Sequence, residues 1–277
     1  VPFDRSGVLE LMDDEPAHRP AGCEWLGASA LRSLEPGLAG FGGALLHSHD
    51  GSVDNVALFA AMQRRAESMR AITIVAAGIL AVNVTVERPR VILEDGDVLD
   101  GASLVVATGA WAAQLEGLPR PLPVRPVRGQ LLMIEGALAQ HVIYGAGGYL
   151  VPRRGEDARY PADRTIVGAT MEDAGFDNAT TPEGLAYLKK TALRIVPATA
   201  AAPLLAHWSG LRPITPDRLP ILGPDPDCPQ LLYACGHGRN GILLAPLTGE
   251  VIGALATGAP SKYDLSAFAI ERFAQAH

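Results

Sequence analysis

The sequence contains no uninterrupted apolar stretch of about 18 residues, the length that a membrane-spanning helix requires. Basic residues are also few: 23 Lys and Arg stand against 30 Asp and Glu, and the net charge at pH 7 is −7. A surface that binds nucleic acid needs clustered cations facing the phosphates. We therefore expect neither a membrane span nor a nucleic-acid partner.

Cysteine is scarce. The chain has three, Cys23, Cys228 and Cys235, and no two of them form a CxxC pair. This spacing favours free thiols in a reducing cytosol over a disulfide or a metal site, so we expect a cytoplasmic protein. No N-terminal signal sequence is recognisable, and the first residue is Val1 rather than Met. We interpret the chain as a fragment or a processed product.

Several catalytic motifs are missing as well. We find no GxSxG, HExxH or phosphate-binding loop, and no defensible pairing of a nucleophile with a base, so hydrolase chemistry has little support. His47 and His49 have the spacing of two residues on one face of a strand and could ligate a metal ion. Because no third ligand is evident, we predict no metal site.

The composition is that of a globular protein: 48% of the 277 residues are apolar and 19% are charged, which allows one or two domains. The first 46 residues predict surface pieces, a short strand over 8–12 and a small helix near 28–35. An amphipathic helix then begins at the N-cap Asp54. Strands are expected at 72–75, 79–87, 91–94 and 104–107, with a hairpin at Asp95-Gly96. This order favours an α/β layer with a small antiparallel insertion.

The second half begins with a proline-rich stretch, 118–126, which we expect to be extended and to cross between domains. Strands at 127–134, 149–153 and 165–170 predict an antiparallel sheet. A helix over 181–195 has Thr181 as its N-cap and Pro182 at its first position. Two further helices are expected, over 241–256 and over 265–274.

A glycine-rich turn, CGHGRNG at 235–241, follows a short apolar strand and leads into the helix over 241–256. Its three glycines bracket one permanent cation, Arg239, and two side chains that form hydrogen bonds. A helix N-terminus presents unpaired N–H groups and partial positive charge, which suit an anion or an electron-rich ring. The alternative is a plain connection between a strand and a helix.

Three further side chains could bind a ligand. Arg212, in the motif GLRP, has the planar donors that capture a carboxylate, although a salt bridge to Asp217 or Glu250 is an alternative. Tyr149, in YLVPR, could direct its hydroxyl to the same carboxylate, or it is a half-buried strand tyrosine. Met171 could form an apolar wall, or it is an ordinary core methionine.

Seven motifs together resemble one family. They are VGATMED, GLRP with TPDRLPILGP after it, GHGRNGILLAPLTG, DGSVD, VVATGAW, PVRGQ and YLVPR. They occur in the order found in flavin-dependent amino-acid oxidases of the glycine oxidase type, within the wider D-amino-acid and sarcosine oxidase family. The resemblance covers nearly the whole chain.

The resemblance implies FAD as the cofactor and the oxidative deamination of glycine or another small amine or D-amino acid. Hydride would pass from the substrate Cα to the flavin, and O2 would reoxidise it to give hydrogen peroxide beside an imino acid. It also implies a homo-oligomer and a place in thiamine biosynthesis. The expected fold is mixed α/β (α+β): an incomplete Rossmann-like FAD-binding domain, 49–121 and 209–277, and an antiparallel-sheet substrate domain, 1–48 and 122–208.

The same resemblance assigns substrate contacts. Tyr149 and Arg212 correspond to residues that bind the substrate carboxylate. Arg239 corresponds to an arginine near both flavin and substrate, and Met171 would line the pocket. A histidine found in some members two residues before the tyrosine is Gly147 here, so no such role is expected.

Cofactor contacts follow in the same way. Ile79 corresponds to the position whose main chain meets the adenine, and Thr108 and Gly109 would lie beside the dinucleotide. The turn and helix start would face the pyrimidine end of the flavin ring: Gly236, His237, Gly238, Arg239, Asn240, Gly241, Ile242 and Leu243.

One family feature is absent. Members begin with a βαβ unit that carries GxGxxG, whose helix N-terminus holds the pyrophosphate. This chain has no GxGxxG. We therefore expect about half of the dinucleotide site to be present, and two alternatives to an active oxidase remain: a truncated non-catalytic remnant, or a half that needs a separate Rossmann segment.

Overall fold

The computed structural model describes residues 1, 3–84, 87–155, 157 and 159–273. The chain divides into two compact units. Unit 1 comprises Val1–Ile72, Arg128–Glu172 and Asp177–Gly210, and unit 2 comprises Thr73–Val127, Asp173–Phe176 and Leu211–His277. The first segment of unit 1 runs beyond residue 48, and which unit binds which ligand stays a prediction. Among the described residues, no helix is both long and apolar enough to cross a membrane.

An eight-stranded sheet forms the centre of unit 1, in the order β14-β10-β13-β12-β11-β2-β4-β3. The strands are β2 (Val8–Met12), β3 (Cys23–Gly27), β4 (Gly43–His47), β10 (Arg125–Glu135), β11 (Val142–Gly145), β12 (Gly148–Arg153), β13 (Arg164–Gly168) and β14 (Leu204–Ile214). The runs β10-β13-β12-β11 and β2-β4-β3 are antiparallel, and β11 joins them by pairing in parallel with β2. A two-stranded sheet joins β1 (Phe3–Asp4) to β5 (Ser52–Val53).

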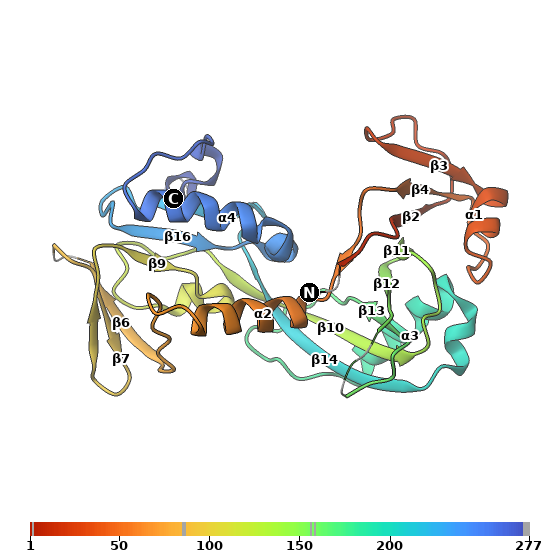
Figure 1. Cartoon of the computed structure of the whole chain (residues 1–277), viewed down its shortest axis with the longest axis horizontal. Helices are drawn as coiled ribbons and strands as arrows, with labels where there is room; N and C mark the ends of the chain where they lie inside the picture. The colour runs from red at the N-terminus through yellow and green to blue at the C-terminus, as the bar shows by residue number, and fades with distance from the viewer. Residues whose placement is uncertain (2, 85–86, 156, 158, 274–277) are drawn as a thin grey trace. The chain divides into compact units, whose positions relative to one another are not determined.

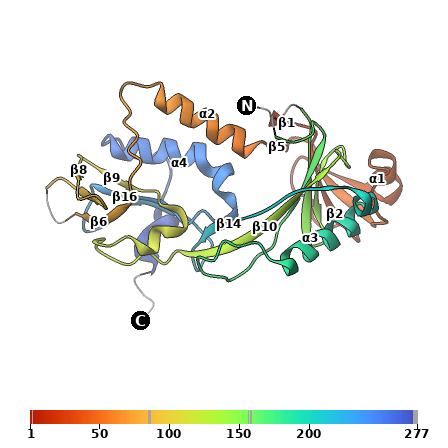
Figure 2. The same cartoon turned by 90° about the horizontal axis from the view of Figure 1, so that it is seen from below.

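Unit 1 also contains three α-helices, α1 (Ala28–Leu34), α2 (Asn55–Glu67) and α3 (Pro182–Ile195), and a 3-10 turn (Pro197–Ala201) follows α3. α3 packs against β12 and β13, as Figures 1 and 2 show. Its buried residues Leu188, Ala192 and Ile195 join Leu150 and Val167 of the sheet in one hydrophobic core. Removing this apolar surface from water is what holds the helix on the sheet.

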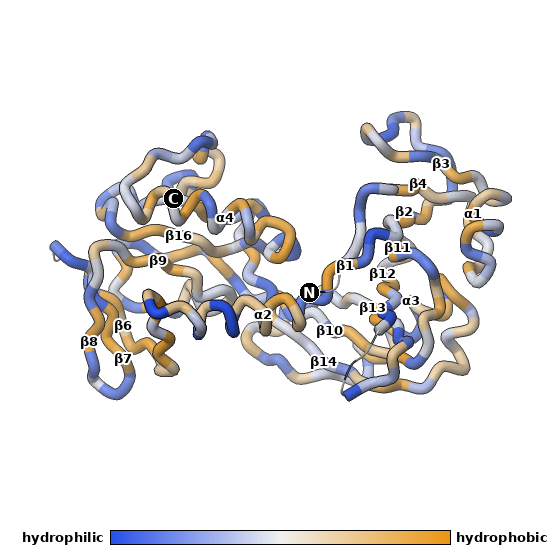
Figure 3. The backbone as a smooth tube through the Cα atoms, in the orientation of Figure 1, coloured by the Kyte–Doolittle hydropathy of each residue, from blue (hydrophilic) through white to orange (hydrophobic). Residues whose placement is uncertain are grey.

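Unit 2 is built on a three-stranded sheet in the order β15-β16-β9, with α4 packed against it. The elements are β9 (Leu104–Val106), β15 (Ile221–Pro224), β16 (Leu231–Cys235) and α4 (Gly241–Ala256). β16 and β9 pair in parallel, and Figure 3 shows both as mainly hydrophobic. Completely buried Leu231 and Tyr233 of β16 lie in the core of this unit.

A second sheet of unit 2 consists of three short antiparallel strands, β6 (Ile79–Asn83), β7 (Arg90–Leu93) and β8 (Val98–Asp100). Short 3-10 helices complete the unit at Gly109–Gln114, Gly238–Asn240, Ser266–Phe268 and Ile270–Phe273. The hairpin predicted at Asp95-Gly96 joins β7 to β8, and Gly96 has the positive φ of 92° that this turn requires.

The two predicted helix starts are confirmed. The Asp54 side chain accepts a hydrogen bond from Ala57 N at 2.9 Å and so caps α2. The Thr181 hydroxyl accepts one from Gly184 N at 3.1 Å and caps α3, with Pro182 at its first position. The mixed α/β fold class predicted from the sequence is also observed.

Three predictions of local structure are wrong. Residues 72–75 form no strand, although they are rich in β-branched residues, and Ile72, Ile74 and Val75 are each more than a third exposed. The predicted helix over 265–274 is two short 3-10 turns in its described part. The first 46 residues are not surface pieces, because β2, β3 and β4 extend the large sheet and Leu9 and Ala44 are completely buried.

Candidate cofactor and substrate sites

The glycine turn between β16 and α4 strongly favours glycine at position 236. Gly236 has φ 75°, and a Cβ there would meet Thr215 Cγ2 at 2.6 Å. Gly238 also has a positive φ, 57°. A side chain at Gly236 would therefore suffer both backbone strain and a steric clash.

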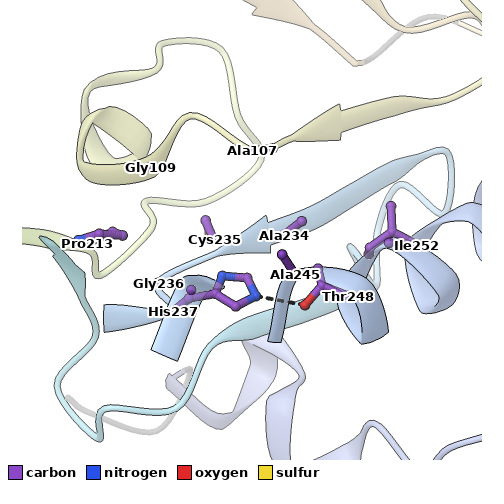
Figure 4. Close-up of a pocket in the computed structure, with 12 residues that line it drawn as sticks. Ala107, Gly109, Pro213, Ala234, Cys235, Gly236, His237, Ala245, Thr248 and Ile252 are labelled. Carbon is purple, nitrogen blue, oxygen red and sulfur yellow. Dashed lines mark hydrogen bonds between the residues drawn. The ribbon is translucent and has the colours of Figure 1, made fainter. Parts of the chain in front are cut away.

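A cavity of about 410 Å³ lies in unit 2 beside this turn (Figure 4). Its wall is formed by residues around the ends of β9 and β16, by the turn and by α4: Ala107, Gly109, Pro213, Ala234, Cys235, Gly236, His237, Gly241, Ala245, Thr248, Gly249 and Ile252. Most of these residues have small side chains or none. Backbone can therefore come close to a flat ligand here, as dinucleotide sites require.

His237 is held in one orientation at the edge of this cavity. Its Nε2 lies 3.0 Å from Thr248 Oγ1, the contact drawn in Figure 4. Burial lowers the pKa of His237, so the ring is neutral at pH 7 and offers a directed hydrogen bond rather than a charge. Cys235 is buried as well, and burial raises its pKa to about 12, which makes it a poor nucleophile.

Beside Ala107 and Gly109 of the wall lies a buried hydroxyl group without a partner among the described residues, Thr108 Oγ1. The next residue, Gly109, has φ 59°, and nothing lies within 4 Å of the point where its Cβ would be. Burying a hydroxyl group without a hydrogen bond costs about 1–3 kcal/mol, so this position favours a ligand that supplies one.

The start of α4 is open to such a ligand. Asn240 occupies the N-cap position, but its side chain makes no capping hydrogen bond. Gly241, the first helical residue, lines the cavity. The first-turn N–H groups and the positive end of the helix dipole are thus not satisfied by a side-chain cap.

Several other predicted cofactor residues lie outside this wall. Ile79, on β6, is 43% exposed, and Ile242 and Leu243 on α4 are 52% and 78% exposed. Arg239 and Asn240 are exposed residues of the turn. The structure therefore brings Gly109, Gly236, His237 and Gly241 together around one cavity and leaves these other positions on the surface of unit 2.

Arg212 lies near the end of β14, in unit 2, and is half-buried. Two residues further on, Ile214 forms an antiparallel bridge with His237, which holds this strand end against the glycine turn. The two carboxylates considered as salt-bridge partners for Arg212 contact other cations. Asp217 pairs with Arg272 at 2.7 Å, and Glu250 pairs with Lys262 at 2.9 Å.

Tyr149 lines a separate cavity of about 600 Å³ in unit 1. On β12, residues Tyr149, Val151 and Arg153 alternate and so share one face of the sheet. Leu131 and Met133 of β10, Ile166 of β13, Trp208 of β14 and the first turns of α2 also line this cavity. Met171, 62% exposed, is among the lining residues of neither cavity.

Arg153 is a lining residue that our sequence reasoning missed. Its guanidinium donates to Ser52 Oγ and to Val53 O, both at 2.8 Å, and so ties β12 to β5, the strand that precedes α2. Burial lowers its pKa. The sequence did carry a signal for Arg153: in YLVPR, Val151 and Arg153 follow Tyr149 by two and four residues, which places all three side chains on one face of a strand.

Comparison with known proteins identifies the family of this chain. A family model described as FAD dependent oxidoreductase matches residues 1–255. The chain belongs to this family. Glycine oxidase from Geobacillus kaustophilus is 33% identical over 255 residues, covering 90% of this chain and 66% of that protein. The bifunctional protein ThiO/ThiG of Synechocystis is 33% identical over 280 residues, which cover 98% of this chain and 41% of that protein.

Solved structures show the same fold. The crystal structure of the Geobacillus glycine oxidase superposes with a TM-score of 0.88 at 29% identity, covering 98% of this chain and 75% of that one. The crystal structure of the iminodiacetate oxidase of Chelativorans superposes with a TM-score of 0.84 at 26% identity, covering 96% of this chain and 76% of that one. The family resemblance and the fold class predicted from the sequence are thus confirmed, and the family is FAD-dependent. The chain spans about two fifths of the length of the ThiO/ThiG proteins that it matches.

Proposed function

We propose that this chain is the main part of an FAD-dependent oxidase of small amines, with glycine or a related amine or D-amino acid as substrate. The observation that carries the proposal is the cavity of unit 2, which the glycine turn and the start of α4 line in the described part of the chain, with the unpartnered Thr108 hydroxyl between two of its lining residues in the sequence. These groups fit the flavin end of FAD, because they combine close backbone approach with donors for an electron-rich ring. Bound FAD would accept a hydride from the amine carbon and pass the electrons to O2, which gives hydrogen peroxide.

In this proposal, unit 2 holds the cofactor. Thr108 and Gly109 lie beside the dinucleotide, and the main chain of Ile79 meets the adenine. The backbone from Gly236 to Leu243 faces the pyrimidine end of the flavin, where the positive end of α4 stabilises negative charge. His237 stays neutral there and keeps its hydrogen bond to Thr248.

The proposed substrate contacts are four side chains. The Tyr149 hydroxyl and the Arg212 guanidinium hold the substrate carboxylate, which fixes the position of the amine carbon. Arg239 lies at the edge between cofactor and substrate, and Met171 forms an apolar wall. We further propose a homo-oligomer in the cytoplasm, which size-exclusion chromatography with light scattering and cell fractionation would test.

Cofactor binding can be tested directly. The purified protein is titrated with FAD, and quenching of flavin fluorescence is followed together with the visible absorbance. Wild type should bind FAD, and Thr108→Val should bind it more weakly, since the hydroxyl partner is lost. Hydrogen peroxide is then measured with glycine, sarcosine and D-alanine.

The outcomes separate the alternatives. A colourless protein that takes up no FAD and makes no peroxide overturns the oxidase proposal for this polypeptide. One alternative is a half that needs a separate Rossmann segment. In that case, FAD uptake and peroxide appear only after such a segment is added. FAD uptake without any amine oxidation would support a non-catalytic remnant.

A further inference from the structure

Three neighbouring strands of unit 1 place a thiol, an imidazole and a carboxylate on one face of the large sheet. Cys23 of β3 lies directly opposite His47 of β4, and His47 lies opposite Val8 of β2. Because strand side chains alternate, Glu10 points to the same face as Val8, one diagonal step from His47. The core face of β2 is the other one, where Leu9 is buried.

The three side chains are in contact. Cys23 Sγ lies 3.2 Å from His47 Nδ1, and His47 Nε2 lies 3.2 Å from Glu10 Oε2. Asp50 Oδ2 is also near the ring, 3.9 Å from Nδ1. Cys23 is half-buried, and the His47 and Glu10 side chains are 22% and 40% exposed. A small molecule in solvent can therefore reach the sulfur.

We propose that Cys23 is a nucleophilic thiol, with His47 as its base and Glu10 as the group that orients the base, and that it reacts with hydroperoxides. A nucleophile in hydrogen-bond contact with a base that a third group holds is the arrangement that activates thiols in proteins. The thiolate is the reactive form of a cysteine, and in the proposed reaction His47 accepts the thiol proton while Glu10 contacts the other ring nitrogen. Nothing in the proposed amine oxidation uses this cluster.

The Cys23 sulfur attacks one oxygen of hydrogen peroxide, an S–O bond forms and the O–O bond breaks. Sulfur is oxidised by two electrons, and the peroxide oxygens are reduced. The departing hydroxide takes the proton of the His47 imidazolium and leaves as water, so the products are a sulfenic acid and a neutral ring. The proposed amine oxidation would also supply hydrogen peroxide for this reaction. Only that source of peroxide rests on the proposed function, and the reactive cluster itself does not.

The chain contains two internal references for the reactivity of this thiol. Cys228 and Cys235 are 8% and 1% exposed, and Cys228 Sγ lies 3.5 Å from Val84 O. Neither sulfur is paired with a histidine in the contacts described above. Reaction at these two cysteines reports unfolding, and the change in the Cys23 rate when His47 or Glu10 is replaced reports the cluster.

The test is alkylation of the folded, full-length chain with iodoacetamide, with peptide mass spectrometry to follow each cysteine. Cys23 should react about tenfold or more faster than Cys228 and Cys235. His47→Asn should slow the alkylation of Cys23 roughly tenfold, because it removes the base. Glu10→Gln should slow it by a smaller factor, because it removes the group that orients the base. His49→Asn is the matched control: His49 is an exposed histidine two residues away, and its loss should leave the rate unchanged.

A second measurement uses the proposed oxidant. The protein is treated with hydrogen peroxide in the presence of dimedone, which traps sulfenic acids, and the adduct should appear on Cys23 and decline in His47→Asn. Thermal unfolding confirms that each variant is folded. The proposal is overturned if Cys23 in a folded His47→Asn variant is alkylated as fast as in wild type, or if peroxide gives no adduct at Cys23. Neither measurement needs FAD or an amine, so failure here is distinct from failure of the oxidase proposal.

Discussion

The Tyr233 hydroxyl donates a hydrogen bond of 2.8 Å to Asp225 Oδ2 inside the core of unit 2. Both residues are buried, with exposures of 0% and 1%. Arg120 Nε donates to the same carboxylate oxygen at 2.8 Å. Asp225 thus lies in the interior between a guanidinium group and a phenol. Burial, and to a lesser extent the hydrogen bond to Asp225, raises the pKa of Tyr233.

Replacing Tyr233 by Phe should lower the free energy of unfolding by about 1–3 kcal/mol, because the buried carboxylate loses one of its donors. Urea unfolding measures the change. Tyr263→Phe is the matched control: Tyr263 is 46% exposed, and its replacement should change stability by less than about 0.5 kcal/mol. Equal effects of the two substitutions would contradict an energetic role for the buried hydrogen bond.

Stability should fall as the pH rises above 9. The ordinary pKa of the Cys235 thiol, which applies in the unfolded chain, is 9.0, and burial raises its pKa to about 12 in the folded protein. Between these values the folded state keeps a proton that the unfolded state has lost, so each pH unit costs up to about 1.4 kcal/mol. The contribution is complete below pH 9 and is lost towards pH 12. The free energy of unfolding, measured with urea from pH 8.5 to 10, should fall less steeply with pH in Cys235→Ala than in wild type. An unchanged pH dependence would count against this assignment.

Gly236→Ala should lower the free energy of unfolding by about 1–3 kcal/mol, because φ is positive and the added Cβ would meet Thr215 Cγ2 at 2.6 Å. It should also weaken FAD binding, since the turn lines the cavity. The matched control is Gly253→Ala in α4, where nothing lies within 4 Å of the new Cβ. There we expect a gain of up to about 1 kcal/mol. Thermal unfolding and FAD titration of both variants measure these effects.

Arg212→Lys should raise KM for glycine about 10- to 100-fold in the FAD-loaded enzyme, with a smaller effect on kcat. Lysine keeps the charge but loses the two parallel donors that hold a carboxylate, and a charge-assisted hydrogen bond contributes about 1.5–3 kcal/mol. Steady-state kinetics measure the change. Arg64→Lys, at an exposed position of α2, should leave KM unaltered. A KM that stays unchanged in Arg212→Lys removes this arginine from the carboxylate site.

Arg153→Met should reduce kcat/KM several-fold while leaving FAD affinity unchanged. Its two hydrogen bonds to Ser52 and Val53 tie the strand of Tyr149 to β5, just before α2, and β12 and the first turns of α2 both line the cavity of unit 1. Without them the cavity wall loses its fixed geometry. Arg65→Met, at an exposed position of α2 outside the lining of this cavity, is the control. If both variants keep full activity, Arg153 does not position the substrate side.

The local elements followed from short-range signals. The cap Thr181 with Pro182 defined the start of α3, and Asp95-Gly96 defined a hairpin, because both depend on backbone conformations within a few residues. The glycine turn at 235–241 was recognisable for the same reason, and with the other motifs it identified the family. The residues that line the unit 2 cavity were predicted only in part, since Thr248 reaches it from about two turns into α4.

Long-range pairing decided the rest. Residues 72–75 have strand-forming side chains but form no strand, whereas β3 and β4 become strands because β2 and β11 extend the sheet to them. A strand satisfies its backbone hydrogen bonds with residues far away in the sequence, so its existence depends on the whole fold. The register of β3 on β4 likewise brought Cys23 against His47, a contact that no spacing in the sequence indicated. Short-range sequence was thus enough for the turns, the helix caps and the family, whereas which strands form and which side chains meet depended on the folded chain.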